Sequence, residues 1–226
     1  MVKQTNLQKH QKKSLLFLIG DSDIDRWPSH LLPYLGKTNW KCVVSGHSGA
    51  TLEDILPIVA ESLRRAPDRD LTNIILVICA GENNIGNGML MSVIEESFQK
   101  LLKIVFGESV DYHDSDFART PKLIFLGPKI EPWLQHDAES RKQYIQLSRC
   151  FERICYQHGS SKERILYLDC LTMFCGDTAI LPGALLGGKA LAETPYFDAD
   201  QLHLSEKGYK IWKERVEDSI LKLTSC

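Results

Sequence analysis

Five short apolar runs, each bounded by residues that favour turns, alternate along this sequence with longer segments of helical period. The runs cover residues 15–19, 40–44, 74–79, 123–126 and 165–168. A strand that is covered on both faces of a sheet has to be apolar throughout, because neither face meets water. The runs therefore predict a parallel sheet of five strands.

The segments between and after these runs carry apolar residues at the three- and four-residue steps of a helix. We expect helices at about residues 52–65, 89–106, 138–157 and 206–223. In the last helix, one face carries Tyr209, Trp212, Val216 and Ile220, which predicts that this face packs on the sheet. The order of strands and helices predicts an α/β fold, a flavodoxin-like three-layer sandwich with helices on both faces of the sheet.

The length and charge of the chain limit its organisation and its partners. With 226 residues, of which 43% are hydrophobic, the chain can bury a core without disulfides or a structural metal. We expect a single domain over residues 1–226, with residues 1–13 as a flexible N-terminal extension. The formal net charge of -2 offers no general attraction for nucleic acid or for an anionic membrane surface. We therefore expect no nucleic-acid partner, and the oligomeric state stays open.

The N-terminal region has the order of a signal peptide, with a basic stretch at residues 9–13 followed by an apolar one. The apolar stretch is short, ends at Asp21 and lacks an A-x-A-like cleavage site, which is more typical of a buried strand. No other run approaches the length of a membrane span. We therefore expect a cytoplasmic protein without a membrane-spanning segment.

The sequence indicates neither a metal site nor a cofactor. Its seven cysteines are an odd number and none stands in a C-x-x-C pair, so we expect them to be structural and reduced. No glycine-rich phosphate loop follows any strand, which disfavours a nucleotide-binding protein. Residues 107–120 include Asp111, His113, Asp114 and Asp116. Such a cluster could hold a cation, but it is far more typical of a hydrated surface loop.

A second irregular segment, residues 176–197, is richer in apolar residues than most loops. It mixes leucine and isoleucine with four glycines and two prolines. Long loops inside compact domains are uncommon and are often functional. We expect this segment to form a wall or lid of a pocket.

Polar clusters follow the first three predicted strands and precede the last helix. They are Gly20-Asp21-Ser22-Asp23, Ser45-Gly46-His47-Ser48-Gly49-Ala50-Thr51, Gly81-Glu82-Asn83-Asn84 and Asp198-Ala199-Asp200-Gln201-Leu202-His203. Each cluster alone can be explained by turns and helix caps. Ligands of a parallel sheet, however, bind beyond the carboxyl ends of its strands, where we expect these clusters to converge.

Together the clusters contain the groups that acyl transfer needs. Ser22 supplies a hydroxyl nucleophile, and His203 supplies an imidazole base. Asp200, three residues before His203, supplies a carboxylate that can orient the ring. The backbone N–H groups of Ser22 and Gly49 and the side-chain amide of Asn83 can form an oxyanion hole.

The same clusters resemble the sequence blocks of the SGNH hydrolases, the GDSL esterase and lipase family. Gly20-Asp21-Ser22 is similar to the first block, with Ser22 in the position of the nucleophile. Gly49, or alternatively Gly46, corresponds to the glycine of the second block, and Asn83 corresponds to the asparagine of the third. Asp200-Gln201-Leu202-His203 closely resembles the D-x-x-H block. The match spans residues 14–215, and all four blocks occur in the family's order.

The resemblance implies a serine hydrolase with Ser22, Asp200 and His203 as its catalytic residues and no cofactor. We expect the substrate to be a carboxylic ester, either a small molecule or an ester of a glycan or lipid, with a short acyl group such as acetyl. The alternative is a catalytically silent binding module, because two residues depart from the family pattern. Asp23 follows the nucleophile where an apolar residue is usual, and Asn84 replaces an aspartate.

Several neighbouring residues are candidates for the pocket. They are Asp23, Trp27, His47, Asn84 and Trp133. Acidic residues such as Asp23 and Asp25 are also typical of a helix start, where the helix dipole favours them. The two tryptophans are equally well explained by packing in the core. Trp133 ends the stretch Gly127-Pro128-Lys129-Ile130-Glu131-Pro132-Trp133, which resembles a proline-bearing loop of bacterial-type family members.

Overall fold

The computed structural model describes residues 13–34, 37, 39–66, 71–107, 121–158, 164–176 and 191–225. Most of the expected N-terminal extension, the predicted surface loop after Gly107 and residues 177–190 of the predicted pocket wall lie outside this part of the chain. The first strand begins at Lys13, the last residue of the expected extension.

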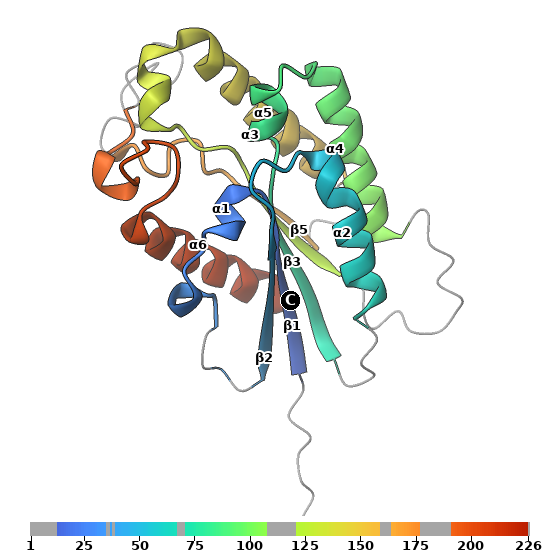
Figure 1. Cartoon of the computed structure of the whole chain (residues 1–226). Helices are drawn as coiled ribbons and strands as arrows, with labels where there is room; N and C mark the ends of the chain where they lie inside the picture. Colours follow the sequence, from blue (N-terminus) through green and yellow to red (C-terminus); the bar gives the residue numbers. More distant parts are fainter. Residues whose placement is uncertain are drawn as a thin grey trace, which may run out of the picture.

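The five predicted strands form one parallel sheet in the order β2-β1-β3-β4-β5. The strands are β1 (Lys13–Gly20), β2 (Trp40–Gly46), β3 (Leu71–Cys79), β4 (Lys122–Leu126) and β5 (Ile165–Leu168). The predicted three-layer α/β fold is thereby confirmed (Figure 1).

The four long helices lie within two residues of their predicted bounds. They are α2 (Leu52–Arg64), α4 (Met91–Phe106), α5 (Ala138–Gln157) and α6 (Glu206–Thr224). The shorter helices are α1 (Ser22–Asp25), η1 (Ser29–Leu31), α3 (Glu82–Gly86), η3 (Pro132–His136) and η6 (Thr194–Tyr196). The sequence pattern did not predict α3, because its five residues are too few to show a helical period.

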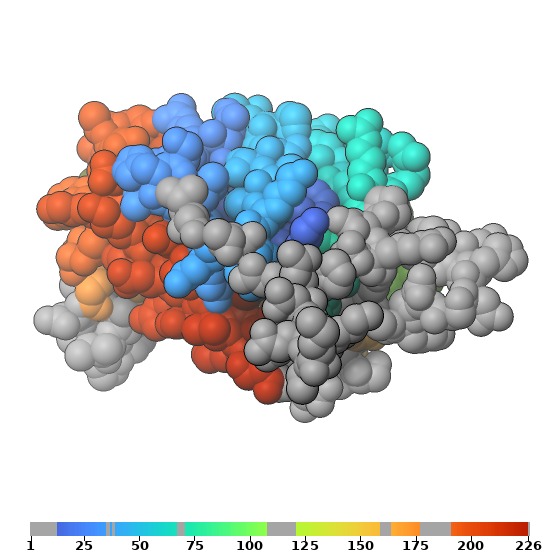
Figure 2. All heavy atoms as spheres, turned by 90° about the horizontal axis from the view of Figure 1, so that it is seen from below, coloured from blue at the N-terminus to red at the C-terminus, as the bar shows by residue number. Residues whose placement is uncertain are grey.

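Alternate residues of each central strand face two separate cores, because successive side chains of a strand point to opposite faces. Leu16 and Leu18 of β1 pack in one core with α1 and α6, whereas Phe17 and Ile19 pack in the other with α2, α4 and α5. The predicted inner face of α6 contributes Trp212 to the first core, as expected. Helix α6 also lies beside η1, which follows β1 and α1 in the chain (Figures 1 and 2).

The two edge strands correct one expectation. The apolar runs predicted that all five strands are covered on both faces, but most residues of β2 and β5 are only half-buried. Both strands lie at an edge of the sheet, where each has a single neighbouring strand.

In the described part of the chain, no helix combines the length and the apolar character that a membrane span requires.

The register of the sheet brings the ends of the strands to one level. Gly20 at the end of β1 pairs with Gly46 on one side and with Cys79 on the other. Cys79 pairs with Leu126, which in turn pairs with Leu168. The segments that leave the strands therefore begin at the same edge of the sheet.

Candidate functional site

The proposed nucleophile opens the short helix that follows β1. Asp21 is the N-cap of α1, and its Oδ1 accepts a hydrogen bond from the backbone N–H of Asp23 at 3.1 Å. Ser22 is the first helical residue and is half-buried. Its carbonyl oxygen accepts a hydrogen bond from the N–H of Arg26 at 2.9 Å. The tight turn thus holds Ser22 directly at the carboxyl end of the central strand.

The proposed base and its carboxylate partner form a compact turn before α6. Nδ1 of His203 lies 2.7 Å from Oδ2 of Asp200, and the other carboxylate oxygen accepts the backbone N–H groups of Leu202 and His203, each at 3.0 Å. Gln201, between them, has a φ of 58°, a left-handed conformation that is uncommon outside glycine. This turn lets one carboxylate bind both the ring and the backbone of His203.

Asp200 is held in its ionised form by these contacts. Partial burial opposes ionisation, but the hydrogen bonds from the His203 ring and from two backbone N–H groups keep the pKa of Asp200 well below its ordinary value. The ionised carboxylate stabilises the fold at neutral pH, and this contribution is lost as the pH falls through the folded-state pKa. Since the side chain is 41% exposed, solvent screening keeps the contribution small.

Two contacts connect this turn and α6 to the helix that carries Ser22. Nη1 of Arg26 lies 3.2 Å from Oδ2 of Asp200, and the hydroxyl of Tyr209 donates to the carbonyl oxygen of Asp23 at 2.8 Å. The structure therefore brings the Asp200–His203 turn to the edge of the sheet where Ser22 lies.

Gly46, which ends β2, and Gly49, which follows it, have different structural roles. A Cβ atom on Gly46 would collide with the backbone of Asp25, so this glycine allows β2 to pack against α1. Gly49 has a φ of 82°, and a Cβ atom there would meet no protein atom within 4 Å. Gly49 is exposed, so the space beside it is open to a substrate. This difference favours Gly49 over Gly46 for that role.

The two asparagines of the third cluster both tie α3 to the segment around the start of α2. Nδ2 of Asn83 donates to the carbonyl oxygen of Ala50 at 3.0 Å. Asn84 is fully buried, and its Oδ1 accepts the N–H of Leu52 at 2.9 Å while its Nδ2 donates to Oε2 of Glu53 at 2.7 Å. The amide thus keeps the acceptor that an aspartate would offer and adds a donor that satisfies Glu53.

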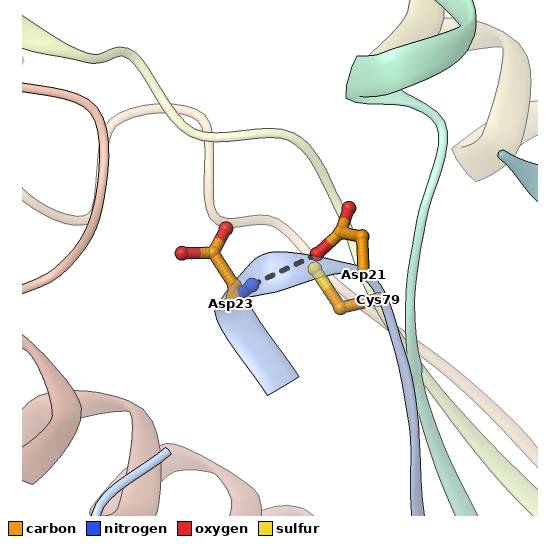
Figure 3. Close-up of side chains that lie close together, drawn as sticks. All are labelled: Asp21, Asp23 and Cys79. Carbon is orange, nitrogen blue, oxygen red and sulfur yellow. Dashed lines mark hydrogen bonds between the residues drawn. The ribbon is translucent and has the colours of Figure 1, made fainter. Parts of the chain in front are cut away.

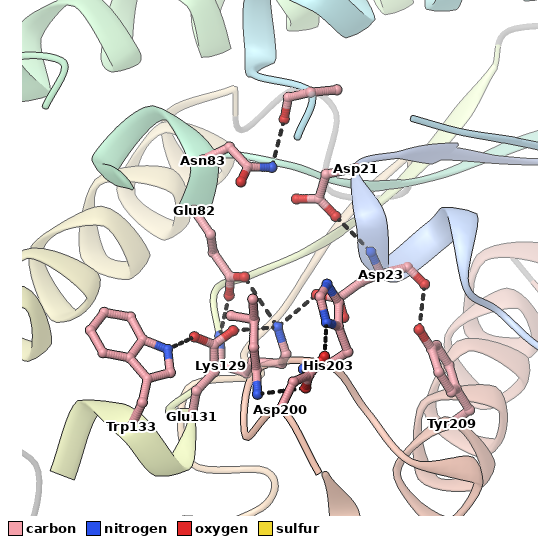
Figure 4. Close-up of polar contacts among 12 residues, drawn as sticks. Asp21, Asp23, Glu82, Asn83, Lys129, Glu131, Trp133, Asp200, His203 and Tyr209 are labelled. Atoms are coloured by element: carbon pink, nitrogen blue, oxygen red, sulfur yellow. Dashed lines mark hydrogen bonds and ion pairs between the residues drawn. The ribbon is translucent and has the colours of Figure 1, made fainter. Parts of the chain in front are cut away.

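A buried ion cluster connects α1 and α3 (Figure 4). We call it the Lys129 cluster: the ammonium of Lys129 with the carboxylates of Asp23, Glu82 and Glu131. Nζ lies 2.6 Å from Asp23 Oδ2, 2.8 Å from Glu131 Oε1 and 3.1 Å from Glu82 Oε2. The backbone N–H of Lys129 also donates to Glu82 Oε1 at 2.9 Å, and the indole of Trp133 donates to Glu131 Oε2 at 2.5 Å.

Burial and charge oppose each other in this cluster. Burial alone would lower the pKa of Lys129, but Asp23, Glu131 and Glu82 raise it well above its ordinary value. Burial raises the pKa of Glu131 well above the usual range and also raises the pKa of Glu82, against the attraction of Lys129. The ammonium therefore stays charged, while the carboxyl groups of Glu131 and Glu82 hold protons more tightly than exposed ones do.

One group near this cluster has the composition of a metal site. Figure 3 shows Asp21, Asp23 and Cys79, whose potential ligand atoms lie within 4.8 Å of one another and are all buried. The cation in contact with this group is the ammonium of Lys129, at 2.6 Å from Asp23. Burial raises the pKa of Cys79 well above its ordinary value, so its thiol keeps its proton. We assign these residues to the support of the β1–α1 turn.

The structure places the candidate pocket residues in different environments. Trp27 is buried against Tyr209 and Trp212, and its indole donates to the carbonyl oxygen of Leu31. Asp23 is in the first turn of α1, as predicted, but its carboxylate is buried against Lys129. Trp133 is half-buried. Direct contact of these residues with a substrate stays a prediction.

His47 differs from the other candidate pocket residues in being exposed, and its Nε2 lies 3.1 Å from the hydroxyl of Ser45. Together with Ser48, Gly49 and Ala50 it borders an open hollow of about 300 Å³, completed by Asp54 and Ile58 of α2. The hollow therefore adjoins the candidate oxyanion donor Gly49.

No local sequence pattern predicted the roles of Lys129, Glu82 and Glu131. In the sequence, the stretch from Gly127 to Trp133 is distinguished only by its resemblance to a proline-bearing loop. A lysine and a glutamate among proline, isoleucine and tryptophan signal burial, but the partners of Lys129 in α1 and α3 are 106 and 47 residues away in sequence. Such pairings follow from the fold and not from a local pattern.

The contacts of Asn84 predict the result of restoring an aspartate at this position. Asn84→Asp should lower the free energy of unfolding by about 1–3 kcal/mol, because a carboxylate at this buried position would face the carboxylate of Glu53 in place of a donor. Glu53→Gln in the same protein should recover part of the loss, since its amide can donate to the new carboxylate. Denaturant unfolding measures both effects, with Asn87→Asp on the exposed end of α3 as the control. Equal stability of Asn84→Asp and the wild type would contradict this assignment.

Comparison with known proteins shows likeness at the level of structure. No protein-family model and no curated protein matches the sequence. Among solved structures, a lipase/acylhydrolase from Enterococcus faecalis aligns with a TM-score of 0.63 at 16% identity, covering 92% of this chain and 95% of that one. A carbohydrate acetylesterase family member from Sinorhizobium meliloti aligns with a TM-score of 0.62 at 16% identity, covering 94% and 100%.

An aryl esterase from M. smegmatis aligns in the same way, with a TM-score of 0.59 at 15% identity over 93% of this chain and 99% of that chain. These alignments extend over nearly the whole of both proteins, so the entire fold is compared. The chain shares the three-layer α/β fold of these proteins, and this is the fold that the resemblance to the SGNH hydrolases implies.

Proposed function

We propose that this protein is a serine esterase that hydrolyses a carboxylic ester through Ser22, His203 and Asp200. The observation that carries the proposal is the 2.7 Å contact between Asp200 and the ring of His203, in a turn linked to the helix of Ser22 by Arg26. An ionised carboxylate that accepts a hydrogen bond from Nδ1 fixes the ring so that Nε2 is the nitrogen available as a base. The esterase and acylhydrolase names of the similar structures support the same reaction class.

The reaction proceeds in two steps. In the first, Nε2 of His203 takes the proton of the Ser22 hydroxyl while the Ser22 oxygen attacks the ester carbonyl carbon. The tetrahedral intermediate then collapses, the bond to the alcohol oxygen breaks, and His203 returns the proton to the departing alcohol. In the second step, water attacks the acyl-serine with His203 again as the base, which releases the acid and restores Ser22.

The oxyanion of each intermediate is stabilised by hydrogen-bond donors from three segments, which follow β1, β2 and β3. These donors are the backbone N–H groups of Ser22 and Gly49 and the side-chain amide of Asn83. Nδ2 of Asn83 carries two hydrogens, and the contact with Ala50 uses one of them. This contact fixes the orientation of the amide before substrate arrives, and such preorganisation is what makes an oxyanion donor effective.

The substrate assigned to this site is a small-molecule, glycan or lipid ester with a short acyl group such as acetyl. The departures at Asp23 and Asn84 do not argue for a silent binding module, because both side chains are buried and bind protein groups. The catalytic residues are the ones that decide between an esterase and a binding module.

Substitution of the three catalytic residues tests the reaction directly. With p-nitrophenyl acetate as substrate, Ser22→Ala and His203→Ala should each abolish nearly all turnover, and the double variant should lose little more, because both residues act in the same step. Asp200→Ala should retain more activity, since an unanchored ring still adopts the productive orientation part of the time.

The exposed residues Ser29 and His30 supply matched controls, because Ser29→Ala and His30→Ala change the same residue types outside the site. Both controls should keep wild-type kcat. Wild-type turnover in a folded Ser22→Ala variant would show that the serine hydrolase proposal is wrong. If Asp200→Ala keeps wild-type activity while His203→Ala is inactive, the catalytic unit is a dyad of Ser22 and His203.

The acyl preference is tested with p-nitrophenyl esters of increasing chain length. We expect kcat/KM to be highest for acetate and to fall as the acyl chain grows. The alcohol part is identical throughout the series, so the change reports on the acyl group alone. A maximum at long acyl chains would contradict the short-acyl assignment and leave the catalytic residues unaffected.

A further inference from the structure

One ammonium group connects the two short helices that carry the proposed nucleophile and the proposed oxyanion amide. Asp23 directly follows Ser22 in α1, and Glu82 directly precedes Asn83 in α3. The carboxylates of Asp23 and Glu82 both bind Nζ of Lys129, and Figure 4 shows this convergence. Lys129 therefore spans the two residues whose separation decides whether the oxyanion forms within reach of the amide.

The surroundings of Lys129 leave its ammonium a single geometry. An ammonium has three N–H donors, and three carboxylates, those of Asp23, Glu82 and Glu131, occupy them. Further hydrogen bonds hold two of these partners: Glu82 also accepts the backbone N–H of Lys129, and Glu131 accepts the indole of Trp133. The cluster is therefore a fixed joint between three segments.

Stability alone does not account for a buried cluster of this kind. The Lys129 side chain is 1% exposed, and those of Asp23 and Glu131 are 3% and 0% exposed. Removing such charges from water is costly, and apolar side chains of similar volume often stabilise a core equally well. What an ion cluster adds is a defined geometry, because each N–H must point at its acceptor.

We propose that Lys129 is a positioning residue that fixes the distance between Ser22 and Asn83 by holding the carboxylates of Asp23 and Glu82. This inference rests on the proposed esterase function. Lys129 acts through its neighbours and does not contact the substrate. Its removal should therefore impair the chemical step while leaving the binding of substrate nearly unchanged.

Lys129→Met, which keeps much of the volume and removes the ammonium, should lower kcat about 10²-fold, the effect of a displacement of about 1 Å in an active site. KM should change little. The matched control is Arg141→Met, which removes another buried cation, one that donates to the carbonyl oxygen of Leu134 and not to the Lys129 cluster. This control should lower thermal stability without a comparable loss of kcat. Equal losses of kcat in the two variants would overturn the proposal.

A double-mutant cycle with Asn83→Ala separates positioning from general destabilisation. In the wild type, Asn83→Ala should lower kcat by about 10²- to 10³-fold, the usual effect of losing one oxyanion donor. In the Lys129→Met background the same change should cost less than about 10-fold, because the amide is already displaced. Fully additive losses would overturn the proposal.

Glu82→Gln provides a milder variant for the case in which Lys129→Met does not fold. It keeps an oxygen for the backbone N–H of Lys129 and removes only the charge that faces Nζ. A loss of kcat of about 10-fold, the equivalent of a weakened hydrogen bond to a charged group, supports the proposal. Wild-type kcat in Glu82→Gln would overturn it.

A spectroscopic readout distinguishes this inference from the proposed function. The side-chain amide of Asn83 gives its own pair of ¹H–¹⁵N signals, which should shift in Lys129→Met and in Glu82→Gln but not in Arg141→Met. If the wild type hydrolyses no ester, the proposed function is wrong, and these signals alone decide the role of Lys129. Unshifted signals in a folded Lys129→Met or Glu82→Gln variant would overturn the positioning role.

Discussion

The five strands are parallel and end at one level, and the positions of the site residues follow from this register. Gly20 pairs with both Gly46 and Cys79, so the segments after β1, β2 and β3 leave the sheet side by side. The next strand ends at the same level, since Cys79 pairs with Leu126. Ser22, Gly49, Asn83 and Lys129 each follow one of these strand ends by a few residues. A shift of one strand would separate these groups.

Local patterns in the sequence predicted most of the strands and helices, and they are also the basis on which the catalytic residues are proposed. Apolar runs predicted the strands because the central strands are buried on both faces, and only the half-buried edge strands β2 and β5 departed from that expectation. The Asp200–His203 pair was predictable because its members are three residues apart and meet within one turn. The Lys129 cluster was not predictable, because its four members come from three segments that only the folded sheet brings together.

The two departures from the family pattern acquire a physical explanation in the structure. Asp23 supplies a carboxylate to the Lys129 cluster. An apolar residue at this position would leave the buried ammonium with one partner fewer. Asn84 supplies both an acceptor to Leu52 and a donor to Glu53. Each departure is therefore matched by a partner elsewhere in the chain. Both changes concern the support of the site, and neither removes one of the proposed catalytic groups.

Covalent labelling tests most directly whether Ser22 is an activated nucleophile. A fluorophosphonate forms a stable bond to a serine oxygen only where a neighbouring base and an oxyanion hole assist the attack. Intact-mass measurement and peptide mapping after such labelling should show one adduct, on Ser22, that is absent from Ser22→Ala. A folded protein that forms no adduct, or one labelled at another residue, would contradict the account.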